Sequence, residues 1–146
     1  MYRLIIESLD QEGRGVARHD GKTIFVDGAL PGEMVEASPY RKKPSFELAT
    51  LNHLLKPSPM RVAPRCAYFG LCGGCSLQHF DVRAQVAAKQ RVLEDNLKHI
   101  GKVKPEEMLP AIYGLPWGYR RRARLTARYV AKKGGVLVGF REKRGS

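Results

Sequence analysis

The 146-residue sequence predicts a mainly β protein, with a small closed barrel, a loop-rich segment that carries one helix, and the start of a further β domain. Three observations support this fold class. Short runs of β-branched and apolar residues, separated by turn residues, fill the chain up to residue 51. Prolines cluster near residue 60, and an apolar pattern with helical spacing follows only after residue 80. The sequence is therefore expected to divide into residues 1–56, 57–118 and 119–146.

The first of these segments predicts the barrel. Strands are expected at residues 2–7, 15–18, 23–26, 34–37 and 46–51. The Asp20-Gly21 pair is typical of a hairpin turn, and Gly28, Pro31 and Gly32 mark the next connection. Five short strands of this kind favour a barrel of the oligonucleotide-binding type, whose face and loops follow a nucleic-acid strand.

The charge of the chain points to the same class of partner. The formal net charge is +12, and residues 1–60 hold 8 Lys/Arg against 8 Asp/Glu, whereas residues 61–146 hold 18 against 6. Cations placed on phosphates release counterions, so a basic region favours nucleic acid as the partner, although a merely basic surface is the alternative. In the barrel, the candidate RNA contacts are the loop cations Arg14, Arg41, Lys42 and Lys43.

The second segment, 57–118, begins with Pro57 and Pro59, which stiffen the chain between two modules. A helix is expected over residues 81–100, with Asp81 as its N-cap and Gly101 as its terminator. Its apolar stripe is expected to pack into a core, and its cations to remain in solvent. The stripe consists of Val82, Val86, Leu93, Leu97 and Ile100.

The third segment, 119–146, alternates in the manner of a strand and then turns at Gly134-Gly135, which predicts a hairpin. If the strand begins at Tyr119, the side chains of Arg120, Arg122 and Arg124 share one face with a spacing of about 7 Å. Arginine binds phosphate through two donors and stacks on bases, so this tract is an RNA-contact candidate. Internal salt bridges to acidic residues outside this sequence are the alternative.

Three cysteines, Cys66, Cys72 and Cys75, form a C-x5-C-x2-C spacing. Clustered cysteines of odd number in a reducing compartment predict metal ligands rather than disulfides. A zinc site completed by His79 is self-contained. A [4Fe–4S] cluster needs a fourth thiolate from elsewhere, and the neighbouring glycines suit a chain that turns around an inorganic core. A three-cysteine cluster for radical chemistry normally has a closer first spacing.

These residues together resemble the uracil-5 RNA methyltransferases of the bacterial ribosomal type, which carry an N-terminal TRAM barrel and an iron–sulfur segment. Three stretches carry the resemblance: Gly13-Arg14-Gly15-Val16 with the later run from Phe25 to Glu33, the loop from Cys66 to His79 that ends C-G-G-C-x-x-Q-H, and the run from Trp117 to Leu125. The last of these favours the enzymes that act on large-subunit ribosomal RNA.

The resemblance implies that Cys66, Cys72 and Cys75 hold a structural [4Fe–4S] cluster with a fourth cysteine beyond Ser146. It also implies RNA contacts from the loop residues Tyr68, Phe69, Gln78 and His79. The domain that binds S-adenosylmethionine, with its nucleophilic cysteine and its base, is absent from this sequence. The complete enzyme would add a thiolate to C6 of a uridine and transfer methyl to C5, so this chain alone is expected to be inactive.

Two alternatives belong to other classes. A non-catalytic RNA-binding module with a zinc knuckle of Cys66, Cys72, Cys75 and His79 needs no further ligand. The methylthiotransferases also join a TRAM barrel to iron–sulfur chemistry, but they place the barrel last and space the cysteines more closely. No apolar run is long enough for a membrane helix and the start does not resemble a signal peptide, so a cytoplasmic protein is expected, with ribosomal RNA as partner and no obligate protein partner.

Overall fold

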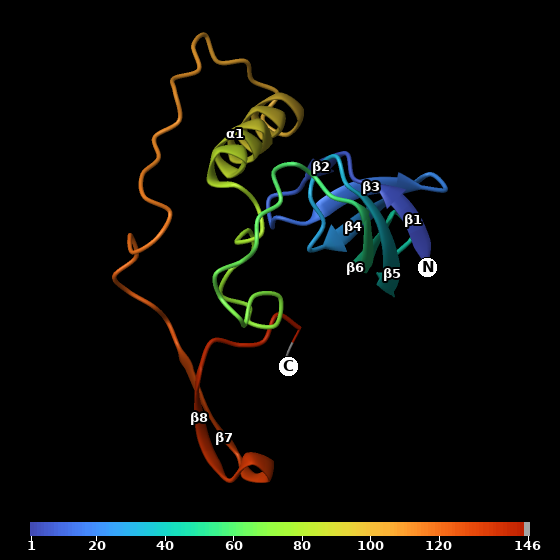
Figure 1. Ribbon diagram of the computed structural model, residues 1–146. Helices are drawn as coiled ribbons and strands as arrows, with labels where there is room; N and C mark the ends of the chain where they lie inside the picture. Colours follow the sequence, from blue (N-terminus) through green and yellow to red (C-terminus); the bar gives the residue numbers. More distant parts are fainter. Residues whose placement is uncertain (145–146) are drawn as a thin grey trace.

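The computed structural model describes residues 1–144, so the last two residues of the expected third segment lie outside the described part of the chain. A six-stranded sheet comes first and is followed by one long helix and a two-stranded hairpin (Figure 1). The elements are β1 (Tyr2–Ile5), β2 (Ser8–Leu9), β3 (Gly15–His19), β4 (Lys22–Asp27), β5 (Met34–Lys42), β6 (Phe46–Lys56), α1 (Val82–His99), β7 (Thr126–Val130), the 3-10 turn η1 (Ala131–Lys133) and β8 (Gly135–Gly139).

The six strands form the expected barrel. Their order in the sheet is β1-β5-β6-β4-β3-β2, with β4 and β6 parallel and every other pair antiparallel. β1 and β2 act as one bent strand that pairs with β5 at its start and with β3 at its end. Glu7, which lies between β1 and β2, donates its amide to the carbonyl of Val16 in β3 at 2.8 Å, and this hydrogen bond closes the barrel. The mainly β fold class with an oligonucleotide-binding-type barrel is therefore confirmed.

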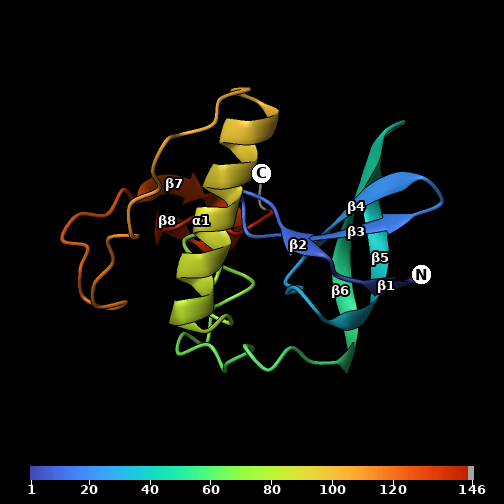
Figure 2. The ribbon, with the colours of Figure 1, turned by 90° about the horizontal axis from the view of Figure 1, so that it is seen from above.

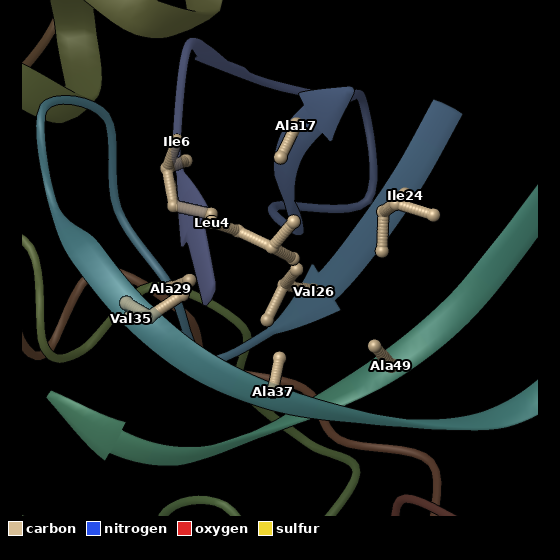
Figure 3. Close-up of a cluster of buried hydrophobic side chains, with 9 residues drawn as sticks. All are labelled: Leu4, Ile6, Ala17, Ile24, Val26, Ala29, Val35, Ala37 and Ala49. Carbon is tan, nitrogen blue, oxygen red and sulfur yellow. The ribbon is translucent and has the colours of Figure 1, made fainter. Parts of the chain in front are cut away.

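Small inward-facing side chains explain why the barrel closes so tightly. Alternate residues of the strands point into one cluster, and four of its nine members are alanines (Figure 3). The cluster contains Leu4, Ile6, Ala17, Ile24, Val26, Ala29, Val35, Ala37 and Ala49, all of which are at most 3% exposed. Outward neighbours such as Arg18 and Thr23 are more accessible, so one strand face builds the core and the other faces outward.

β5 and β6 run further than the sequence patterns predict. The expected strands end at residues 37 and 51, whereas β5 and β6 continue to Lys42 and Lys56. Beyond the barrel core they pair mainly with each other, and the pairing shifts register three times, once beside Pro39. Such bulges bend a strand around a small barrel and accommodate the missing proline N–H. Apolar alternation marks only the part of a strand that covers the core, so it could not reveal these extensions.

Gly15 occupies a position where the core leaves no room for a side chain. A Cβ atom built there lies 2.8 Å from Cγ2 of Ile6 and 3.0 Å from both Cβ and the carbonyl oxygen of Ala29. We therefore expect Gly15→Ala to lower the free energy of unfolding by about 1–3 kcal/mol, as overpacking does. Urea unfolding of the variant measures the effect. Gly114→Ala is the control, because a Cβ there meets nothing within 4 Å, and an equal loss in both variants would contradict the argument.

The helix α1 begins where the sequence predicts. The carboxylate of Asp81 accepts the Arg83 amide at 2.9 Å, which is the expected N-cap interaction. The expected packing of its apolar stripe into a core is wrong, because no residue of α1 is buried, and Leu93 and the capping residue Ile100 are 50% and 77% exposed. Residues 101–125 run as exposed irregular chain instead of covering the stripe. No helix within residues 1–144 is long and apolar enough to span a membrane.

The hairpin forms, but the predicted start of its first strand is wrong. β7 begins only at Thr126, so Arg120, Arg122 and Arg124 lie in irregular chain and share no strand face. The register explains this, because Thr126 pairs with Gly139, the last residue of β8. After Gly139 the chain leaves the hairpin and pairs with the cysteine loop, so within residues 1–144 no strand lies beside the tract before Thr126.

Candidate nucleic-acid interface and cysteine loop

One large groove brings several distant segments together. It has a volume of about 1590 Å³ and lies between the β2–β3 loop, the cysteine loop, the first half of α1, and the irregular segment from Tyr113 to Arg124. In both ribbon views the irregular chain and the hairpin lie outside the barrel, and Figure 1 shows the hairpin well away from α1 (Figures 1 and 2). The groove is thus built from modules that are far apart in the sequence.

The walls of the groove are basic and aromatic. Cations outnumber anions by eight to four among the described residues that line it. The cations are Arg14, Arg65, Lys89, Arg120, Arg122, Arg124, Lys143 and Arg144, the anions are Asp10, Glu12, Asp27 and Asp81, and the aromatic residues are Tyr40, Phe80, Tyr113, Trp117, Tyr119 and Phe140. Cations for phosphates interleaved with rings for bases are what single-stranded nucleic acid requires.

Two stacked arginines are fixed in this groove. The guanidinium of Arg65 lies 5.1 Å from the ring centroid of Trp117, and that of Arg14 lies 4.9 Å from the ring of Phe25. Arg14 is also held by Asp10, with Nε and Nη2 each 2.7 Å from Oδ2. Such contacts fix the orientation of a guanidinium and leave its other face for a base or phosphate.

The groove unites some predicted RNA-contact residues and leaves others out. Arg14, Gln78, Arg120, Arg122 and Arg124 all line it, although the three arginines reach it from irregular chain. The other candidates, Arg41, Lys42, Lys43, Tyr68, Phe69 and His79, do not line it. The sequence analysis missed Arg65, Trp117, Lys143 and Arg144, because their contacts join residues about 50 to 100 positions apart and no local pattern records such pairs.

The cysteine loop is organised by its own backbone. The amides of Phe69 and Cys72 donate to the carbonyls of Cys66 and Tyr68 at 3.1 and 2.9 Å. The Gln78 side chain accepts the Cys66 amide at 3.2 Å and so closes the loop at its base. The Gly74 amide donates to Sγ of Cys72 at 3.3 Å, a contact typical of cysteines that bind metal clusters.

The loop contains thiol ligands for a soft metal or a cluster, but these ligands are not grouped into a metal site. Cys66 and Cys75 are exposed and Cys72 is half-buried. Within residues 1–144, no three His, Cys, Asp or Glu side chains are grouped closely enough to hold a metal ion. Three thiols, an amide directed at one sulfur, and Gly70 at φ 90° still fit the chemistry of an iron–sulfur loop, provided that the sulfurs converge on binding.

His79 lies in the interior instead of at the RNA surface. The residue is only 2% exposed, and the centroid of its ring lies 5.1 Å from that of the Phe69 ring. Neither ring nitrogen has a hydrogen-bond partner in the described chain. The structure therefore places His79 away from the surface at which an RNA contact was expected. Burial, reinforced by the positive charge of Arg61, lowers the pKa of His79 to about 4, so the ring is neutral at pH 7.

The end of the described chain ties the cysteine loop to the barrel. The Gly73 amide donates to the Arg141 carbonyl and the Lys143 amide to the Leu71 carbonyl, both at 2.8 Å. On the barrel side, Nη1 of Arg144 donates to Oγ1 of Thr50 at 2.7 Å. The described chain therefore ends in a segment that is paired with the cysteine loop and bonded to the barrel.

A buried ion pair fixes the barrel to the segment that enters the loop. Glu33 is completely buried, and its carboxylate accepts Arg61 Nε at 2.6 Å and Nη2 at 2.8 Å. It also accepts the amides of Leu30 and Ser58 at 2.8 and 3.2 Å. Burial alone would raise the pKa of Glu33, but the hydrogen bonds from Arg61 and the two amides hold that pKa below its usual value. The sequence analysis did not single out this pair.

The fold and the loop define an oligonucleotide-binding-type barrel joined to a cysteine-rich segment. Residues 1–38 match the TRAM domain model, which agrees with the N-terminal TRAM barrel expected from the sequence. The chain is 72% identical, over 98% of its length, to 23S rRNA (uracil(1939)-C(5))-methyltransferase RlmD of Nitrosospira multiformis. Proteins of the same name from Chromobacterium violaceum and Dechloromonas aromatica are 66% and 63% identical over 97% of the chain.

The chain corresponds to only part of each relative. It covers 33% of the proteins from Nitrosospira multiformis and Dechloromonas aromatica, and 28% of the protein from Chromobacterium violaceum. It therefore spans about a third of the length of the curated relatives that it matches.

Proposed function

We propose that this chain is the RNA-binding and cluster-bearing portion of an enzyme that transfers methyl from S-adenosylmethionine to C5 of a uridine in 23S ribosomal RNA. The observation that carries the proposal is the 72% identity over 98% of the chain to a methyltransferase of that name. The basic, aromatic groove beside the TRAM barrel supports the RNA-binding role. An enzyme with this substrate works where ribosomal RNA is available, so we place it in the cytoplasm.

In this proposal the chain itself contributes recognition. Arginines of the groove hold phosphates and fix the register of the RNA, while ring faces such as that of Trp117 receive unstacked bases. Methyl transfer to an unactivated pyrimidine carbon needs a covalent thiolate adduct, which belongs to a catalytic domain beyond this sequence. The chain alone should therefore bind RNA without methylating it.

The direct test compares this chain with the full-length protein that carries it. Each is incubated with radiolabelled S-adenosylmethionine and unmodified 23S ribosomal RNA, and the labelled position is mapped after digestion. The proposal expects 5-methyluridine at one position with the full-length protein and none with this chain. Methylation of transfer RNA only, or no methylation at all, would overturn it.

We also propose that Cys66, Cys72 and Cys75 hold a [4Fe–4S] cluster whose fourth cysteine follows residue 146. The amide directed at Cys72 and the pairing of Lys143 with the loop support this ligand set. When bound, the cluster would pin a loop that buries few of its own side chains. The ring of His79 is buried and stacks on Phe69, so the zinc knuckle would need this ring to leave its packed position.

Metal analysis of anaerobically purified protein separates these cofactors. Iron and sulfide with a broad absorption at about 400 nm are expected in the full-length protein and are lost in Cys72→Ser, while His79→Ala retains them. Stoichiometric zinc that is lost in His79→Ala would instead establish the zinc knuckle. Cys72→Ser protein is first checked by circular dichroism, so that loss of cluster is distinguished from loss of fold.

Removing three groove cations is expected to weaken RNA binding. The triple variant Arg120→Ala, Arg122→Ala and Arg124→Ala should raise the Kd for a single-stranded 23S fragment by about ten-fold or more, and lower the slope of log K against log salt by about 2. Fluorescence anisotropy at several salt concentrations measures both quantities. The control removes Lys98, Lys104 and Arg121, three cations outside the groove. Equal effects in both triples would show that only net charge matters.

A further inference from the structure

A second cluster of cations and rings lies on the barrel away from the groove. Tyr2, His19, Lys22, Lys42 and Lys43, which we call the barrel-end patch, come from the start of β1, the β3–β4 hairpin and the end of β5. None of them lines the groove. In both ribbon views the N-terminus, beside Tyr2, lies on the opposite side of the barrel from α1 (Figures 1 and 2).

The rings of this patch are fixed in place. The Tyr2 and His19 ring centroids are 4.5 Å apart with a tilt of 40°. The Tyr2 hydroxyl donates at 3.0 Å to Oε2 of Glu47, whose residue is 4% exposed. Tyr2 also packs against the barrel core, so it cannot turn away from its neighbour. The two rings therefore form a rigid platform, and the His19 side chain remains 37% exposed at its edge.

Cations surround the platform in excess over anions. Nζ of Lys42 lies 6.0 Å from the Tyr2 ring centroid, and Nζ of Lys22 lies 3.4 Å from Oε1 of Glu47. Glu47 compensates only part of this charge, because Arg41 and Lys43 are also exposed beside Lys42. Asp20 faces His19 at 3.6 Å and is the other carboxylate paired at this end of the barrel among residues 1–144.

We propose that the barrel-end patch is a second RNA-binding surface, which receives a phosphate on Lys42 and Lys43 and a base against the His19–Tyr2 platform. A fixed aromatic edge flanked by lysines has the chemistry of single-stranded RNA recognition. Because the patch and the groove lie on different sides of the barrel, a short strand occupies one of them, whereas a folded RNA bridges both. This inference rests on the proposed function. It adds that the protein binds its RNA in a folded form that contacts the barrel on two sides.

Bridging predicts how affinity depends on RNA length. Two linked contacts act at a high effective concentration, so a folded RNA binds more tightly than either contact alone allows. For a folded 23S fragment, we expect the double variant Lys42→Ala and Lys43→Ala to raise the Kd by about ten-fold and to reduce the salt slope by about 1 to 2. His19→Ala should raise the Kd by about five-fold or more, through lost stacking.

The experiment measures the Kd for RNA and its salt dependence by fluorescence anisotropy. It uses both this 146-residue chain and the full-length protein that contains it. Five proteins are compared: the parent, the Lys42/Lys43 double variant, His19→Ala, the groove triple variant at Arg120, Arg122 and Arg124, and a control that lacks Lys132 and Lys133. The probes are a folded 23S fragment and a ten-nucleotide single strand. Circular dichroism confirms that each variant is folded.

The proposal requires that the patch variants raise the Kd for the folded RNA more than the Kd for the short strand. They must also raise the Kd for the folded RNA more than the Lys132/Lys133 control does. It is overturned if the patch variants bind the folded RNA like the control while the groove triple variant still loses affinity. Loss in neither variant would instead count against RNA binding by this chain, and so against the proposed function. Unchanged RNA binding together with weaker binding of an acidic peptide would assign the patch to a protein partner.

Discussion

Replacing Glu33 with alanine is expected to lower the free energy of unfolding by about 3–5 kcal/mol, the usual cost of removing one partner of a buried ion pair. The variant leaves the Arg61 guanidinium beside the barrel without its carboxylate. It also leaves the amides of Leu30 and Ser58, which both donate to Glu33, without acceptors. Urea unfolding monitored by circular dichroism measures the loss. A change below about 1 kcal/mol would show that the pair contributes little beyond its own desolvation.

Two matched variants sharpen this test. Glu7→Ala removes an exposed carboxylate and should leave stability nearly unchanged. Glu33→Gln keeps the shape of the side chain but removes its charge. Because the pKa of Glu33 is lowered in the folded chain, its stabilisation is present above its ordinary value of 4.5 and is lost as the pH falls through the folded value. The difference between parent and Glu33→Gln should therefore shrink in acid.

The same ion pair links stability to the site. Arg61 also donates from Nη2 to the Gly28 carbonyl at 2.7 Å, so it fixes the chain just before the cysteine loop to the barrel. The segment that Arg61 anchors leads into the cysteine loop, which lines the groove together with the β2–β3 loop. A variant that breaks the pair is thus expected to loosen the groove as well as the barrel.

Local signals in the sequence explain which elements were predictable. Asp20 and Gly21 have φ values of 47° and 76°, as a tight hairpin turn requires, and the pair was recognised from residue type alone. Asp81 was likewise recognised as a cap because capping depends on a side chain and an amide two residues apart. The barrel follows from alternation, which reports directly which residues face a core.

Long-range pairing explains what the sequence patterns could not show. The alternation around Arg122 favours a strand, but a strand needs a neighbour, and β8 ends at Gly139. The apolar spacing in α1 indicates a face that would pack against other residues. It does not show whether residues of this chain pack against Leu93. Spacing made His79 a plausible ligand, although only the fold reveals that its ring is buried.

Lowering the pH is expected to destabilise the folded chain through His79. The pKa of His79 is about 4 in the folded chain against 6.5 for an ordinary histidine. Between pH 4 and pH 6.5 the unfolded chain therefore binds a proton at this ring that the folded chain does not bind. The free energy of unfolding should thus fall by about 3 kcal/mol as the pH drops from 6.5 to 4, with the full contribution present above 6.5. Urea unfolding of the metal-free chain across this pH range measures the slope.

Substitution separates the contribution of this ring from that of the acidic residues. His79→Leu cannot take up a proton and also removes two buried nitrogens without partners, so it should be close to the parent in stability at pH 7 and more stable than the parent at pH 4. His99→Gln alters an exposed histidine at the end of α1 and should keep the parental slope. If His79→Leu and the parent lose stability in parallel, the ring must gain a partner or water on protonation, and the interior around Phe69 must be more open than the contacts indicate.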